Sequence, residues 1–484
     1  MHVRDLKCST LRWLTAVIGV VALSVAPSLA QEPDAKKAAD AAPAAKPAAP
    51  TPPTAPPATP PTTPPTTPAA SAEAPATPAA PEASEVAEAV ELFKVRNFDQ
   101  ALEKLKDACK KDPRLPPPWM FMAQFYSSAK MAGAVRPALE RAAEETPTDP
   151  EAYLILGELA LREHRPIEAK LLLEKGMDLT GQYNGNADRK AVLQQRGHHS
   201  VATLAELRGD WKQALEHLAE LGKQQPDNAH VMVRTGRALF FLDQLDAAKQ
   251  SLEKAAAADK TILPSDMVLA QLYQQRGDDE KTAQHLAAAL TSHAEDFQTR
   301  LTAAQIELNR GNLDAAAEHA KNATRLDANS NPAAIVSGTI ALHRGDYEEA
   351  ARQFQQVAVA LPNDFAATNG LALALCEQDS PDARRRALDY AQSNVQKFPQ
   401  QPEALATLGW TLYKADQIDQ AEQALGRVFA TGNVSAATAY YLARVAIKRG
   451  RTDEAKRLLQ SALDTKPAFA KRAEAQSTLD LLNK

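Results

Sequence analysis

A small residue recurs at a nearly constant interval along most of this 484-residue chain. Eight of the ten steps between successive positions are 34 residues long, and the other two are 45 and 37 residues. A unit of 34 residues is shorter than the roughly 40 residues that fold unaided, so each unit must bury its apolar side chains against its neighbours. The recurring positions are Ala101, Val135, Ala169, Ala214, Ala248, Thr282, Ala316, Ala350, Ala387, Ala421 and Ala455.

Each period contains the pattern of two helices. Within residues 402–433, Leu405, Leu408 and Leu412 are spaced as residues on one face of a first helix. Gly409 lies on the same face, where the missing side chain allows another backbone to approach closely. After a short polar turn, a second apolar helical face is formed by Ile418, Ala421, Ala424, Leu425 and Val428.

Glycine marks the turn between the two helices in several units. It can adopt the positive φ that ends a first helix, and a following Asp or Asn can cap the second helix. These turns are Arg208–Asp210, Arg276–Asp278, Arg310–Asn312, Arg344–Asp346 and Arg449–Arg451.

With this period and pattern, the chain resembles the tetratricopeptide-repeat family over roughly residues 84–467. The matching family positions are Leu408, Gly409, Leu412, Ala421 and Leu425 in one unit, and Gly338, Gly345, Ala350, Phe354, Val357 and Pro362 in another. The resemblance implies an all-α fold, a right-handed α-solenoid of about eleven repeats that exceeds one superhelical turn. Residues 468–484 are expected to form a C-terminal capping helix.

Two insertions interrupt the period. Eleven extra residues lie near Gly181–Asn186, where we expect a loop, with a helix lengthened through Arg189 to Gln195. Three extra residues lie around Asp379–Asp382. Insertions between repeats map to loops, and a neutral surface loop is the simpler interpretation of both.

The N-terminus is typical of a secreted bacterial protein. Residues 1–30 have the basic start, apolar core and small final residues of a signal peptide, cleaved before Gln31, with a retained N-terminal membrane anchor as the alternative. Residues 31–83 are rich in Ala, Pro and Thr, which predicts a disordered linker. We therefore expect a periplasmic or secreted chain with no membrane span after cleavage.

Composition and motifs argue against several function classes. The net charge of −5 gives no basic field for nucleic acid. No zinc-peptidase, Walker, CxxC or GxSxG motif occurs, so we expect no catalytic residue, no cofactor and no metal. The adjacent His198 and His199 have no ligand partner at a suitable spacing. Cys109 and Cys376 are expected to be free thiols, because repeats so far apart do not touch.

The resemblance places a binding groove along the first helices of the repeats. Its middle part is expected to be basic and rich in amides, and its C-terminal part aromatic and exposed; the alternative is a merely solvated polar face, with Trp410 packed on the next repeat. The Lys/Asn carboxylate clamp of some family members is absent, since Met120, Leu154, Val233 and Ile335 occupy its places. The candidate binding residues are Arg196, His199, Thr203, Arg234, Arg237, Gln271, Gln274, Gln275, Gln305, Asn309, Trp410, Tyr413, Lys414, Tyr440 and Arg444.

These observations favour a non-enzymatic scaffold or adaptor of the cell envelope that binds a partner protein or an extended peptide. One alternative is a glycan- or cell-wall-binding module that uses Trp410 and Tyr440. Another is a passive structural spacer. The sequence does not identify the partner.

Overall fold

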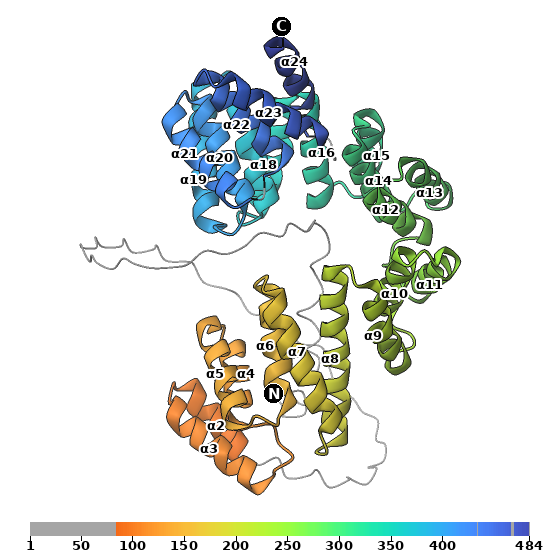
Figure 1. Cartoon of the computed structure of the whole chain (residues 1–484), viewed down its shortest axis with the longest axis vertical. Helices are drawn as coiled ribbons and strands as arrows, with labels where there is room; N and C mark the ends of the chain where they lie inside the picture. Colours follow the sequence, from red (N-terminus) through yellow and green to blue (C-terminus); the bar gives the residue numbers. More distant parts are fainter. Residues whose placement is uncertain (1–83, 433, 466–468, 484) are drawn as a thin grey trace, which may run out of the picture. The chain divides into compact units, whose positions relative to one another are not determined.

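The computed structural model describes residues 84–432, 434–465 and 469–483. About 80% of these described residues are helical, and none of them forms a strand. The all-α fold is therefore confirmed. The chain divides into two compact bodies, and the boundary falls between Ala360 and Leu361. We call them the N-terminal body and the C-terminal body and describe each separately (Figure 1).

The described part of the N-terminal body consists of eight helix pairs, repeats one to eight. Each first helix packs against the second helix of its own repeat, and consecutive repeats contact one another. The pairs are α2 (Ser84–Lys94) with α3 (Phe98–Lys111), α4 (Pro118–Ser128) with α5 (Ala132–Glu145), α6 (Pro150–Arg162) with α7 (Pro166–Gln182), α8 (Ala187–Arg208) with α9 (Trp211–Gln224), α10 (Ala229–Phe241) with α11 (Leu245–Ala258), α12 (Ser265–Arg276) with α13 (Asp279–Ser292), α14 (Phe297–Arg310) with α15 (Leu313–Leu326), and α16 (Asn331–Arg344) with α17 (Tyr347–Ala360).

The described part of the C-terminal body contains repeats nine to eleven and one further helix. The pairs are α18 (Phe365–Cys376) with α19 (Pro381–Lys397), α20 (Pro402–Lys414) with α21 (Ile418–Ala430), and α22 (Ala436–Lys448) with α23 (Thr452–Asp464). The last helix, α24 (Arg472–Leu482), packs on α23 and buries Ala475 and Leu479. The expected capping helix is thus present.

A small residue in the first helix lets the two helices of a repeat approach closely. At Gly409, an added Cβ would lie 2.5 Å from Cγ of Leu425, which is 16 residues further along the chain. The same spacing joins Gly157 to Leu173 and Gly236 to Leu252. In other repeats Ala replaces the Gly, as in Ala202 and Leu218, and both members are buried. The sequence period therefore reports this repeated contact.

The turn between the paired helices uses a left-handed residue in ten of the eleven repeats of the described chain. Gly occupies this position in five of them, at Gly209, Gly277, Gly311, Gly345 and Gly450. The other five carry a side chain at positive φ, between 56° and 62°: Arg96, Lys130, His164, Asp243 and Asp416. Glycine in the sequence therefore predicts five of these turns correctly, but five other turns of the same shape contain no glycine at this position.

The residues that flank the turn glycine have two distinct roles. Asp210 and Asp278 accept hydrogen bonds from backbone N–H groups of the following helix, which confirms the predicted caps. Asn312 does not cap; its amide instead donates to Glu307. The preceding Arg holds the repeat before it, since Arg276 Nη2 donates to the backbone oxygen of Phe240 at 2.8 Å. The sequence pattern had given no role to this Arg.

The expected loop at Gly181–Asn186 is present but shorter than predicted. The extra residues lengthen α7 to 17 residues and α8 to 22 residues, and only residues 183–186 separate the two helices. The predicted helix through Arg189 is correct, and Figure 1 shows the long α8 beside α6 and α7. Arg189 ties α8 to the start of α6 through Asp149 and Glu151, at 2.7 and 2.6 Å.

Several predictions fall on residues outside the described part. These are the signal peptide at residues 1–30, its cleavage before Gln31 and the linker at residues 31–83. A single superhelix through all eleven repeats also stays a prediction. Among the described helices, none combines the length and apolar character that a membrane crossing requires.

Candidate functional site

The N-terminal body presents a narrow polar stripe on its first helices. In α14, most side chains pack against neighbouring helices, whereas Gln298, Gln305 and Asn309 are exposed and lie on one face. In α12, which contacts α14, the corresponding positions include Gln271 and Gln275. We call these five residues the amide stripe. Within the described residues, none of the five side chains makes a hydrogen bond to another group.

One predicted amide is already engaged. Gln274 Nε2 donates to the backbone oxygen of Ile306 at 3.0 Å and so joins α12 to α14. It therefore acts within the fold, while its neighbours Gln271 and Gln275 remain available to a ligand.

Arg196 and Arg234 are likewise occupied by acidic side chains of neighbouring helices. Arg196 forms a bidentate pair with Glu158 of α6, at 2.7 and 2.8 Å, and both side chains are 16% exposed. Arg234 pairs with Glu206 of α8 at 2.9 Å and also donates to Thr203. A guanidinium whose N–H donors are already paired with a carboxylate has few donors left for a ligand.

His199 lies between these two arginines. Burial and the adjacent guanidinium of Arg234 lower the pKa of His199 to about 4, so the imidazole is neutral at pH 7. Its Nδ1 is 3.2 Å from Arg234 Nη1, a geometry in which the ring nitrogen accepts and Arg234 donates. His199 therefore helps to position Arg234.

Arg237 differs from the other two arginines. It lies one helical turn after Arg234 in α10, and it makes no hydrogen bond or ion pair with any described residue. Its Nε is buried without a partner. An unsatisfied buried donor costs about 1–3 kcal/mol, a penalty that a ligand carboxylate would relieve. Arg237 is thus the predicted basic residue that remains free to bind.

The aromatic part of the predicted groove is closed. Trp410 is 2% exposed and Tyr440 is fully buried, so the expectation of exposed rings there is wrong. Trp410 stacks on Tyr413 of its own helix and on Tyr441 of the next repeat, with ring centroids 5.0 and 4.5 Å apart. The alternative interpretation, packing of Trp410 on the next repeat, is correct, because the rings complete the contact between α20 and α22.

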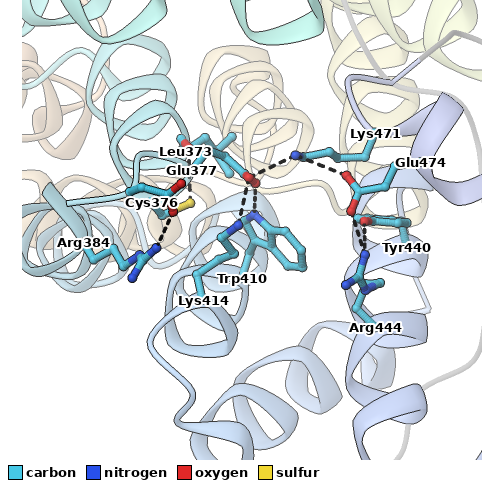
Figure 2. A network of polar contacts seen from close by, with 11 residues as sticks. Leu373, Cys376, Glu377, Arg384, Trp410, Lys414, Tyr440, Arg444, Lys471 and Glu474 are labelled. Atoms are coloured by element: carbon cyan, nitrogen blue, oxygen red, sulfur yellow. Dashed lines mark hydrogen bonds and ion pairs between the residues drawn. The ribbon is translucent and has the colours of Figure 1, made fainter. Parts of the chain in front are cut away.

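Charged residues surround these rings in the C-terminal body (Figure 2). Glu377 accepts hydrogen bonds from Trp410 Nε1 at 2.8 Å and from Lys414 Nζ at 3.0 Å. Lys471 Nζ, which lies just before α24, is also 3.0 Å from this carboxylate. Arg444 contacts the Tyr440 hydroxyl and Glu474 of α24. The C-terminal segment therefore reaches the residues that were predicted to bind a ligand.

Sequence reasoning missed Glu377, Lys471 and Glu474. The period contained a signal for Glu377, which lies 68 residues, or two periods, after the predicted groove residue Asn309. Lys471 and Glu474 lay in a segment interpreted only as a cap.

The described histidine and cysteine residues form no group placed to hold a metal ion, and the two described cysteines are not bonded to each other. His198 contacts His217 of α9, with the Nδ1 atoms 2.9 Å apart, rather than its neighbour His199. Among the described residues, no group of three or more His, Cys, Asp and Glu is placed to hold a metal ion. Cys109 and Cys376 are both free, as expected. Burial raises the pKa of the Cys109 thiol to about 11.

Comparisons with known proteins find tetratricopeptide-repeat matches in parts of the chain. One tetratricopeptide-repeat family model matches residues 206–272, and a second matches residues 336–402 and 406–470. These matches support the resemblance to tetratricopeptide repeats within both bodies. No relative was found among curated proteins.

Several solved structures match this chain at low identity and with TM-scores below 0.5. A tetratricopeptide-repeat protein from Parabacteroides merdae is 12% identical, with a TM-score of 0.42, and the match covers 53% of this chain and 99% of that one. Yeast Tom70 is 13% identical, with a TM-score of 0.33 and coverage of 83% and 95%. PilF of Pseudomonas aeruginosa is 19% identical, with a TM-score of 0.31 and coverage of 44% and 96%.

Proposed function

We propose that this protein is a non-enzymatic scaffold whose N-terminal body binds an extended segment of a partner protein along the amide stripe. One observation carries the proposal: five amide side chains and the guanidinium of Arg237 lack partners within the described residues, on a surface where neighbouring polar groups are paired. Amides both donate and accept hydrogen bonds, as an extended peptide backbone requires. The guanidinium of Arg237 can donate two parallel hydrogen bonds to a carboxylate.

The stripe favours an extended ligand over a compact one. Gln271 and Gln275 are one turn apart on α12, and Gln305 and Asn309 repeat that spacing on α14. Adjacent helices thus offer the same kind of group at regular intervals, which suits a chain that presents backbone N–H and C=O groups in alternation. We therefore propose an acidic, extended segment as the ligand.

We further propose that the scaffold works in the bacterial cell envelope. This step rests on the signal-peptide pattern of residues 1–30 and on the linker composition of residues 31–83. The glycan alternative depended on exposed rings at Trp410 and Tyr440, and their burial removes that support. A passive spacer is the outcome expected if the amide stripe binds nothing.

Site-specific crosslinking in cells tests the proposal. A photo-crosslinking amino acid at position 305 should capture one envelope protein, and Arg237→Glu should reduce the capture at least tenfold. The matched control is Arg141→Glu, which reverses a charge on the second helix of repeat two, at a side chain that is 63% exposed. The proposal fails if position 305 captures no protein, or if Arg237→Glu and Arg141→Glu capture as much as the wild-type chain.

A further inference from the structure

The segment before and at the start of α24 makes two separate sets of contacts in the C-terminal body. One set caps repeat eleven: Arg472 donates to the backbone oxygens of Leu463 and Thr465, at 2.6 and 3.3 Å, while Ala475 and Leu479 are buried. These contacts involve only the adjacent repeat, as a capping helix requires.

The second set reaches across the first helices of repeats nine to eleven. Lys471 binds Glu377 at the end of α18, which is 94 residues earlier in the sequence. Glu474 accepts from Arg444 of α22 at 2.6 Å, and the Phe469 ring lies 6.1 Å from the ring of Tyr440. A capping helix requires no contact with repeat nine, so capping does not account for this second set of contacts.

The local helix chemistry explains only part of the position of Lys471, whose ammonium lies 3.4 Å from the carboxylate of Glu474, three residues later. This residue is at the N-cap of α24, where it makes no side-chain cap hydrogen bond. A lysine has no acceptor for the free N–H groups there, and its charge is unfavourable beside the positive end of a helix. The side chain is nevertheless only 13% exposed, and its ammonium lies between Glu377 and Glu474, with the shorter distance, 3.0 against 3.4 Å, to Glu377 of repeat nine.

The carboxylate of Glu377 is placed to bind a cationic group. Its side chain is 7% exposed and follows α18 at the C-cap, where the helix dipole disfavours a carboxylate. Lys414 and Trp410 supply two of its contacts from α20. The remaining contact comes from Lys471, outside the paired helices of the repeats (Figure 2).

We propose that the groove side of repeats nine to eleven is a second protein-binding site and that Phe469–Glu474 is its built-in occupant. The site takes a segment with an aromatic residue, a basic residue two positions later and an acidic residue three positions beyond. Glu377 receives the basic group, Arg444 receives the acid and Tyr440 contacts the ring. A partner segment of this chemistry binds only when it displaces the internal one.

The covalent connection to the rest of the chain determines how strongly the internal segment Phe469–Glu474 competes with a partner segment. A short connection to the groove gives the internal segment an effective concentration of about millimolar, so a partner segment at micromolar concentration binds poorly to the wild-type chain. Loss of one charged contact weakens the internal segment without removing the groove. This site shares no residue with the amide stripe, so the two proposals succeed or fail separately.

A labelled peptide of residues 469–484 tests the site by fluorescence anisotropy with the full chain. The Lys471→Glu chain should bind the peptide at least tenfold more tightly than the wild-type chain. Lys471→Glu with Glu377→Lys should lose this gain, because the internal pair is restored with reversed charges and Lys at 377 repels the peptide. A peptide that itself carries Lys471→Glu should not bind the Lys471→Glu chain.

Hydrogen exchange of the wild-type chain provides a second readout that needs no variant to fold. Millimolar unlabelled peptide should increase exchange in α24 as it displaces the internal segment. The proposal is overturned if α24 stays protected under these conditions, or if a Lys471→Glu chain with native helicity binds the peptide no better than wild type.

Discussion

Arg196 of α8 and Glu158 of α6 form a bidentate ion pair between first helices of neighbouring repeats, at 2.7 and 2.8 Å. Ser200 donates to the same carboxylate at 3.0 Å. Burial opposes the charge of Arg196, but Glu158 outweighs it and raises the pKa of the guanidinium. Arg196, which the sequence predicted to contact a ligand, therefore holds two repeats together.

Arg196→Ala is expected to lower the free energy of unfolding by about 3 kcal/mol, because it leaves Glu158 buried without its main partner. Urea denaturation followed by circular dichroism measures this change. Arg237→Ala is the matched comparison and should not destabilise the chain, since it leaves no described partner unpaired and removes a buried donor that has no acceptor.

The double variant Arg196→Met/Glu158→Leu separates the charge from the contact. Removal of both charges should restore much of the lost stability, because no unpaired charge remains and only the Ser200 hydroxyl loses its acceptor. If Arg196→Ala is as stable as the wild-type chain, the ion pair does not hold α6 and α8 together.

Lys130→Gly should stabilise repeat two. Lys130 has a φ of 58°, and its exposed side chain makes no interaction with the described residues. A left-handed conformation costs a non-glycine residue about 1–2 kcal/mol, while glycine adds entropy to the unfolded chain. We expect a net gain of about 0.5–1 kcal/mol in the opening free energy of α4 and α5, measured by native-state hydrogen exchange.

Gly345→Ala provides the reverse test at an equivalent turn, where φ is 80°. It should lower the opening free energy of α16 and α17 by about 1 kcal/mol. Equal effects of the two substitutions, in the same direction, would contradict the assignment of a shared turn geometry.

Protonation of His199 should make the fold less stable in mild acid. Its pKa is about 4 in the folded chain, below the ordinary value of 6.5, so the unfolded chain binds a proton that the folded chain does not. The contribution is fully present above about pH 6.5 and is lost as the pH falls toward 4. At about 1.4 kcal/mol per pKa unit, the loss reaches about 3 kcal/mol.

The measurement is the denaturation midpoint as a function of pH for the wild-type chain and for His199→Gln. Burial also lowers the pKa values of His198, His217, His319 and His343, so the difference between the two curves carries the prediction. His199→Gln should flatten the curve between pH 4 and 6.5. Parallel curves for His199→Gln and wild type would disprove the assignment.

The sequence by itself determined the repeat, the helix pairs and the five turns that contain glycine. Each depends on residues close together in the chain: Gly409 and Leu425 lie 16 residues apart, and Gly345 sets its own turn. Periodicity reports such contacts because every repeat makes them again. It also assigned Gln305 and Asn309 to a surface that the structure leaves exposed.

Only the tertiary structure decided which predicted groove residues remain free. Arg196 and Arg237 have the same chemistry in the sequence, but Glu158 lies beside only one of them. Lys471 meets Glu377 from 94 residues away, and Trp410 is buried by the next repeat. Such pairings depend on how whole repeats stack, because each partner comes from another helix and no local pattern records its position.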